Sequence, residues 1–70
     1  MKKQDELDLW NEVKDTEENN AIWWPKLFKK FNIPEKRGYF IIDKWNNKGI
    51  LEYGVSLRTA WIEDKSKWKE

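Results

Sequence analysis

The amino-acid sequence predicts one small α+β domain, in which three helices accompany a small antiparallel sheet. Three observations lead to this prediction. Apolar residues recur at helical spacing in three segments, and stop signals at Asn32 and Gly49 end two of them. Two short runs rich in apolar and aromatic residues follow near the end of the chain. We expect the sheet to contain a short strand at residues 21–24 and a hairpin at residues 50–62.

The first helix is expected at about residues 6–15. Leu7, Trp10 and Val13 follow one another at helical spacing, with Leu9 on the flank. Acidic residues in the first turn suit the positive end of the helix dipole. The polar stretch that follows is typical of a loop.

The second helix is expected at about residues 25–31, directly after the short strand at residues 21–24. Pro25 disfavours helical backbone at Trp24. The same proline is well placed in the first turn of a helix, where its missing N–H costs nothing. The apolar face of this helix comprises Leu27, Phe28 and Phe31.

The third helix is expected at residues 34–47, between Asn32 and Gly49. Both flanking residues tolerate the left-handed backbone that ends a helix. Gly38 lies inside this helix and costs roughly 1 kcal/mol relative to alanine. Close packing against the second helix is the favoured explanation, and close approach of a ligand is the alternative. The apolar face comprises Ile41, Ile42 and Trp45.

The hairpin is expected to pair residues 50–53 with residues 59–62 through the loop at residues 54–58. We therefore expect a single domain at residues 5–63. Residues 1–4 and 64–70 are expected to be flexible tails, with Trp68 as the side chain able to dock back.

The composition limits both the means of stabilisation and the chemistry. The 70 residues include no cysteine and no histidine, so neither a disulfide nor a zinc site of the usual kind is expected. Six tryptophans, three phenylalanines and two tyrosines offer a core instead, because each large ring buries ~150–250 Å². No glycine-rich phosphate loop or activated nucleophile is present, so we expect no enzyme activity, no metal and no cofactor.

No apolar run is long enough to span a bilayer, and the beginning of the chain, MKKQDELDLW, lacks the apolar core of a signal peptide. A cytoplasmic location is therefore expected. The net charge of +1 is unevenly distributed. Residues 1–20 hold three lysines against seven acidic residues, a net of −4, and residues 21–70 hold eleven basic against six acidic residues, a net of +5. This favours a basic face on the second part, although two solvated faces of opposite sign would look the same.

Residues 27–53 carry a specific order of apolar and glycine-like positions. Leu27, Phe31, Asn32 and Ile33 form a helix end, then Ile41, Ile42 and Trp45 form a helix stripe, and Gly49, Ile50 and Leu51 follow. This order resembles a minimal winged helix-turn-helix domain of bacterial and phage transcription regulators, with Asn32 in the place of a glycine. Gly38 departs from the pattern, which has a valine-like core residue there. Tyr39 and Phe40 depart from it as well, where the family has polar residues.

The resemblance implies a small transcription regulator that binds double-stranded DNA. The helix at residues 34–47 would enter the major groove, and the loop at residues 54–58 would be the wing. Glu35 and Asp43 oppose this function, because they lie on the same helix face and repel phosphate. The implied DNA-binding residues are Lys36, Arg37, Tyr39 and Lys44 on the third helix, Ser56 and Arg58 in the wing, and Lys29 and Lys30 on the second helix.

The alternative is a protein-interaction module, such as a phage-type adaptor or inhibitor, on the same scaffold, because fold does not settle function. Exposed aromatic side chains would then form the binding surface. Two properties separate the alternatives: the burial of Tyr39 and Phe40, and the gathering of positive charge on the third helix and wing. The aromatic candidates are Trp23, Trp24, Tyr39, Phe40 and Trp68.

Overall fold

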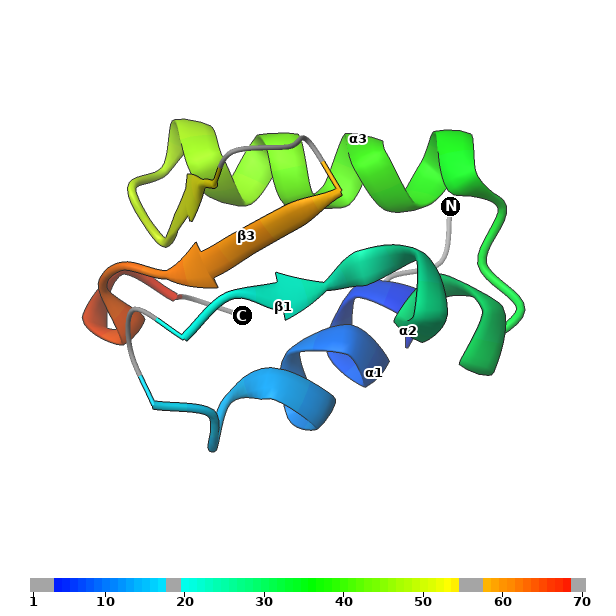
Figure 1. The fold of residues 1–70 in the computed structure, drawn as a ribbon, viewed down its shortest axis with the longest axis horizontal. Coiled ribbons are helices and arrows are strands. Elements are labelled where there is room, and N and C mark those ends of the chain that lie inside the picture. Colours follow the sequence, from blue (N-terminus) through cyan, green and yellow to red (C-terminus); the bar gives the residue numbers. More distant parts are fainter. Residues whose placement is uncertain (1–3, 18–19, 55–57, 69–70) are drawn as a thin grey trace.

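The structure is a computed structural model that describes residues 4–17, 20–54 and 58–68. It confirms the predicted α+β class, in which helices accompany a small sheet (Figure 1). The elements follow the order α1 (Gln4–Val13), β1 (Ile22–Trp23), α2 (Trp24–Lys30), α3 (Glu35–Asn47), β2 (Leu51–Tyr53), β3 (Thr59–Ile62) and the 3-10 helix η1 (Lys65–Lys67).

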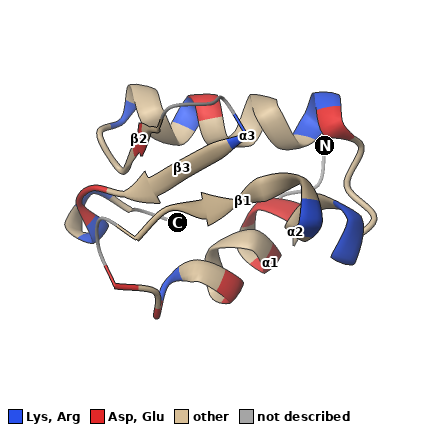
Figure 2. Cartoon of the chain, in the orientation of Figure 1, with Lys and Arg blue, Asp and Glu red and all other residues tan. Residues whose placement is uncertain are grey.

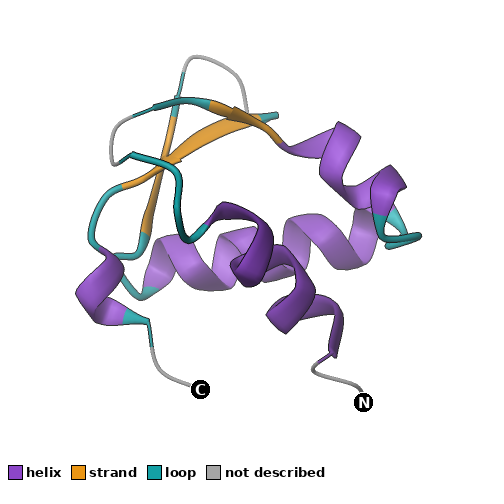
Figure 3. Cartoon of the chain, turned by 90° about the horizontal axis from the view of Figure 1, so that it is seen from below, coloured by secondary structure: helices purple, strands orange, loops and turns teal. Residues whose placement is uncertain are grey.

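The three strands form one antiparallel sheet in the order β1-β3-β2. Ile22 pairs with Ala60, and Leu51 pairs with Ile62. Figure 3 shows the strands on one side and the helices on the other, so the core lies between two layers. The strand between the first two helices therefore joins the hairpin that follows α3, an arrangement consistent with a winged helix.

The expected stop signals end both helices of the pair. Asn32 has a φ of 56° and Gly49 has a φ of 84°, both in the left-handed region. In each case the next residue donates its N–H to a carbonyl five residues earlier, as in a Schellman motif. These bonds join Ile33 to Phe28 at 2.8 Å and Ile50 to Trp45 at 2.9 Å.

The transition from β1 to α2 comes one residue earlier than predicted. Trp24 is the first residue of α2 and not the last of the strand, with Pro25 in the first turn. The backbone N–H of Trp24 donates to the carbonyl of Arg58 at 3.0 Å, and its indole Nε1 donates to the carbonyl of Ala60 at 3.3 Å. Trp24 therefore continues the pairing of the sheet while it begins the helix.

The first helix, α1, begins and ends two residues earlier than predicted, and its inward face differs as well. Leu9, Trp10 and Val13 are buried, whereas Leu7 is only half-buried. The inward face also includes Glu6, whose side chain is a buried carboxylate. The prediction missed Glu6 because a charged residue is almost never placed in a core unless it has a partner.

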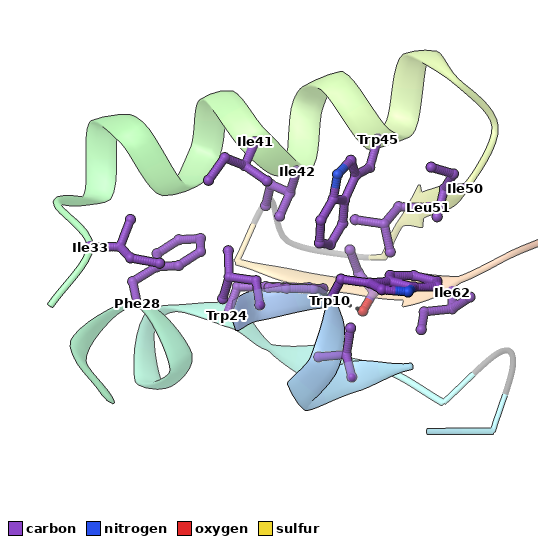
Figure 4. Packing of buried hydrophobic residues seen from close by; sticks show 13 residues of the cluster. Trp10, Trp24, Phe28, Ile33, Ile41, Ile42, Trp45, Ile50, Leu51 and Ile62 are labelled. Carbon is purple, nitrogen blue, oxygen red and sulfur yellow. Dashed lines mark hydrogen bonds between the residues drawn. The ribbon is translucent and has the colours of Figure 1, made fainter. Parts of the chain in front are cut away.

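The core is an aromatic cluster around Trp45 of α3, which is 0% exposed (Figure 4). Edge-to-face contacts join its ring to Trp10, Trp24 and Trp68, with centroid separations of 5.8, 6.0 and 5.5 Å. Trp10 and Trp68 stack at 4.6 Å. Such arrangements match the charge distribution of aromatic rings. α1, α2, α3 and the segment after β3 thus meet at one residue.

The described residues 64–68, which follow β3, contact the rest of the fold. The Asp64 side chain accepts the N–H of Ser66 at 3.0 Å and caps η1. This short helix brings Trp68 back onto Trp10. Burial of the two large rings opposes the entropy of ordering the segment.

Gly38 is required by packing, as the favoured explanation holds. A Cβ atom at this position would lie 2.7 Å from three ring atoms of Phe28. The missing side chain therefore lets the Phe28 ring of α2 lie directly beneath α3.

We expect Gly38→Ala to destabilise the domain. Forcing an extra methyl group into a packed core costs about 1–3 kcal/mol, which outweighs a gain of about 1 kcal/mol in helix propensity. The free energy of unfolding in urea measures the difference. In a Phe28→Leu background the same substitution should cost less, because the clashing ring is gone. Equal costs in both backgrounds would contradict the proposed clash.

Candidate interaction surface

Helix α3 presents three different sides. Gly38, Ile41, Ile42 and Trp45 point into the core. The outward side is exposed and carries Lys36, Phe40, Asp43 and Asn47. The flank toward α1 carries Arg37 and Lys44, which are only partly exposed. Side chains of α3 that pair with other residues of the chain must therefore be separated from those that are available to a partner.

Arg37 binds Asp5 of α1 through two hydrogen bonds. Its Nε donates to Asp5 Oδ2 at 2.8 Å, and its Nη2 donates to Asp5 Oδ1 at 3.0 Å. Such two-pronged arginine–carboxylate pairs are geometrically well defined. The charge of Arg37 is thus matched by an acidic partner 32 residues away in sequence, and its predicted DNA contact stays a prediction.

Lys44 is likewise engaged within the molecule, and its predicted DNA role stays a prediction. Its Nζ donates to Glu6 Oε1 at 2.9 Å. The other carboxylate oxygen of Glu6 accepts the indole N–H of Trp45 at 2.8 Å. Glu6 is only 7% exposed, so both oxygens of a buried charge have donors, as the cost of burying a carboxylate demands.

The acidic partners of these pairs have lowered pKa values. Hydrogen bonding by Arg37 is the main cause at Asp5, and it outweighs the opposing effect of burial on that pKa. At Glu6 burial is the largest influence and raises the pKa, but the donors from Trp45 and Lys44 together outweigh it. Both carboxylates are thus charged at neutral pH in the folded chain.

The two aromatic residues that depart from the family pattern lie side by side on α3 and differ in exposure. Tyr39 is half-buried, and its ring contacts Phe28 edge-on at 5.2 Å. Its hydroxyl is buried and has no hydrogen-bond partner among the described residues. Phe40 is 59% exposed, and the Arg37 guanidinium lies 5.5 Å from its ring centroid.

A shallow groove lies between the outward side of α3 and the end of β2. Its volume is about 360 Å³, and its walls are Tyr39, Phe40, Asp43 and Tyr53. The Tyr53 hydroxyl donates to Asp43 Oδ1 at 3.2 Å and ties strand to helix. Burial, assisted by the Asp43 carboxylate, raises the pKa of Tyr53 to about 12. The groove therefore combines three aromatic rings with one carboxylate.

The other predicted DNA-binding residues are more scattered. Lys29, Lys36 and Arg58 are exposed, whereas Lys30 is exposed but pairs with Glu12 of α1 at 2.9 Å. Ser56 and most of the predicted wing lie outside the described residues. Figure 2 shows basic and acidic residues next to each other in two parts of α3, with an uncharged stretch between them.

Comparisons of the chain with known protein families, with curated proteins and with solved structures found no match. No helix within the described ranges is long and apolar enough to cross a membrane. Any proposal about function must therefore start from the structure itself, that is, from the groove and the ion pairs of α1.

Sequence reasoning missed the groove, although it singled out Tyr39 and Phe40. Asp43 was noted only as a charge that repels phosphate, and Tyr53 only as part of a strand. One weak signal was available in the sequence. Asp43 and Tyr53 lie only ten positions apart, on either side of the end of α3, so they could lie close together in the fold. Their contact depends on how β2 turns back along α3.

We expect the ion pairs of α1 to make stability fall in acid. The folded-state pKa values of Asp5 and Glu6 lie below their ordinary values of 3.8 and 4.5. At a pH above these ordinary pKa values, the two charged carboxylates therefore stabilise the fold. The contribution is lost as the pH falls through the lowered folded-state pKa values. Urea midpoints between about pH 6 and pH 2 measure this dependence. A variant with Asp5→Asn and Glu6→Gln should show a flatter profile, and an unchanged profile would contradict the assignment.

Proposed function

We propose that this chain is a protein-interaction module that binds its partner through the groove between α3 and β2. The observation that supports this function best is the exposure of Phe40, 59% of whose surface is open to solvent on the outward side of α3. The neighbouring Tyr39 and Tyr53 extend the same surface. Aromatic rings on a rigid element are the side chains that contribute most to protein interfaces.

The same geometry weighs against DNA as the main partner. A helix that enters the major groove needs cations and hydrogen-bonding side chains on its outward side. That side of α3 has Lys36 as a cation, but it also has Phe40 and the acidic Asp43. The cations Arg37 and Lys44 bind acidic residues of α1 instead. These two pairs leave α3 with fewer cations to release counterions from DNA.

The groove is also well supported for binding. Tyr39 rests on Phe28, a core residue that is 1% exposed. Tyr53 lies in the sheet and is tied to Asp43 of α3 by a hydrogen bond. Two walls of the groove are therefore fixed before any partner arrives, which lowers the entropy cost of association.

Site-specific photo-crosslinking tests this function. We expect Phe40→p-benzoyl-phenylalanine to give a discrete protein adduct in cells that make the protein, because the probe replaces an aromatic side chain in the proposed interface. Mass spectrometry identifies the adduct, and excess wild-type protein should compete it away.

The matched control places the same probe at Trp23. This residue is also an exposed aromatic, at 53%, but it lies on β1 and not in the groove. The adduct should be absent or much weaker from this position. Equal adducts from both positions, or no protein adduct from position 40, would refute the proposed function.

Binding of double-stranded DNA, as in a small transcription regulator, is the second candidate function. The observation that favours it is the exposure of Lys29 and Lys36, which have no ion pair with any described residue. They belong to α2 and α3, the two helices that form the helix-turn-helix unit. Arg58 is exposed just before β3 and would approach the DNA backbone from the hairpin.

Under this second function, Lys36→Gln should reduce the salt dependence of duplex binding. The slope of log affinity against log salt falls by about 0.9 for each lost phosphate contact. Fluorescence polarisation at low salt with mixed-sequence duplexes measures it. Lys14→Gln, an equal charge change in an exposed residue after α1, should leave the slope unchanged. An absence of binding at tens of micromolar protein would exclude this candidate.

A further inference from the structure

We propose that the groove between α3 and β2 receives an arginine side chain from a basic segment of the partner protein. This inference rests on the proposed function and names the chemistry that its site recognises. Three observations lead to it: the carboxylate of Asp43, the pairing of nearby cations with acidic residues of α1, and the aromatic side chains that line the groove.

Asp43 supplies the charge that would select the ligand. Its Oδ1 accepts the Tyr53 hydroxyl at 3.2 Å. Its Oδ2 makes no hydrogen bond or ion pair with any described residue. A carboxylate with one oxygen fixed and the other open is oriented to accept a charge-assisted hydrogen bond from a cation.

The neighbouring cations of α3 do not neutralise Asp43. Arg37 is matched by Asp5 and Lys44 by Glu6. Lys36, on the same outward side of the helix, is exposed and lacks an acidic partner among the described residues. The groove itself therefore keeps one negative charge, which favours a cationic group and disfavours the phosphates of a nucleic acid.

The aromatic walls make arginine a better match than lysine. The Arg37 guanidinium already lies 5.5 Å from the centroid of the Phe40 ring, so this ring receives a guanidinium within the molecule itself. A planar guanidinium can stack on a ring while it donates hydrogen bonds to a carboxylate, whereas an ammonium acts as a compact point charge. Tyr39 and Tyr53 add two further aromatic rings to the lining of the groove.

NMR titration with three short peptides tests the inference. The peptides are rich in glycine and serine and differ only at one central position, which is arginine, lysine or the uncharged isostere citrulline. We expect the arginine peptide to shift the signals of Tyr39, Phe40, Asp43 and Tyr53. Citrulline should bind about two- to fivefold more weakly, as expected for loss of an exposed ion pair, and lysine should lie between them.

Asp43→Asn provides the decisive variant. The asparagine can still accept the Tyr53 hydroxyl, so the groove should keep its shape while it loses its charge. Binding of the arginine peptide should weaken by about two- to fivefold, and binding of the citrulline peptide should not change. Asp15→Asn is the matched control, because Asp15 is an exposed residue just after α1 and carries the same charge change away from the groove.

The inference is overturned if the arginine and citrulline peptides bind equally, if Asp43→Asn binds the arginine peptide unchanged, or if the shifts lie outside the groove. A DNA duplex that shifts the groove signals more strongly than the peptide also overturns it. A partner crosslinked at position 40 whose binding survives Asp43→Asn would refute the arginine inference alone. Selective binding of the arginine peptide without any crosslinked partner would support the groove chemistry and refute the proposed cellular function.

Discussion

The fold depends on a single buried carboxylate, Glu6, and on the donors that surround it. Trp45 fills the centre of the core, and its indole N–H must find an acceptor there, because a buried unsatisfied donor costs about 1–3 kcal/mol. Glu6 supplies that acceptor from α1, and Lys44 balances its charge from the rim. The position of α1 against α3 is thus fixed by hydrogen bonds as well as by burial. In a chain of 70 residues without cysteine, such directional contacts help to select one packing among several.

The same contacts determine what the outer surface of α3 offers. Glu6 and Asp5 engage Lys44 and Arg37, two of the cations that a DNA-binding helix would use. The outward side carries an exposed phenylalanine and an acidic residue beside Tyr53, together with the exposed Lys36. The acidic character of residues 1–20 therefore has a structural consequence, since two of its seven acidic residues match basic residues of α3. The acidic first part of the chain thus matches two cations of the basic second part.

The order of elements was predictable because its signals are local. Pro25 begins a helix and Asn32 and Gly49 end helices through backbone preferences that operate within a few residues. The site was only partly predictable, because its geometry is set by contacts between distant residues. The pairs Asp5–Arg37 and Glu6–Lys44 span 32 and 38 residues, and no local pattern indicates which acid meets which base. Tyr39 and Phe40 stood out as departures from a family pattern, but only the packed fold shows that one rests on the core while the other is exposed.

Core packing and the groove are coupled through one glycine. Because Gly38 has no side chain, the Phe28 ring lies against α3, and that ring supports Tyr39 edge-on. Tyr39 in turn forms a wall of the groove. The glycine costs the helix roughly 1 kcal/mol, but its position allows both the filled core and the support beneath Tyr39. Phe40 has no comparable structural reason for its exposure, since many polar side chains would suit a solvent-facing helix position equally well. An aromatic side chain there, beside an open carboxylate and on a fixed support, favours a surface that serves recognition.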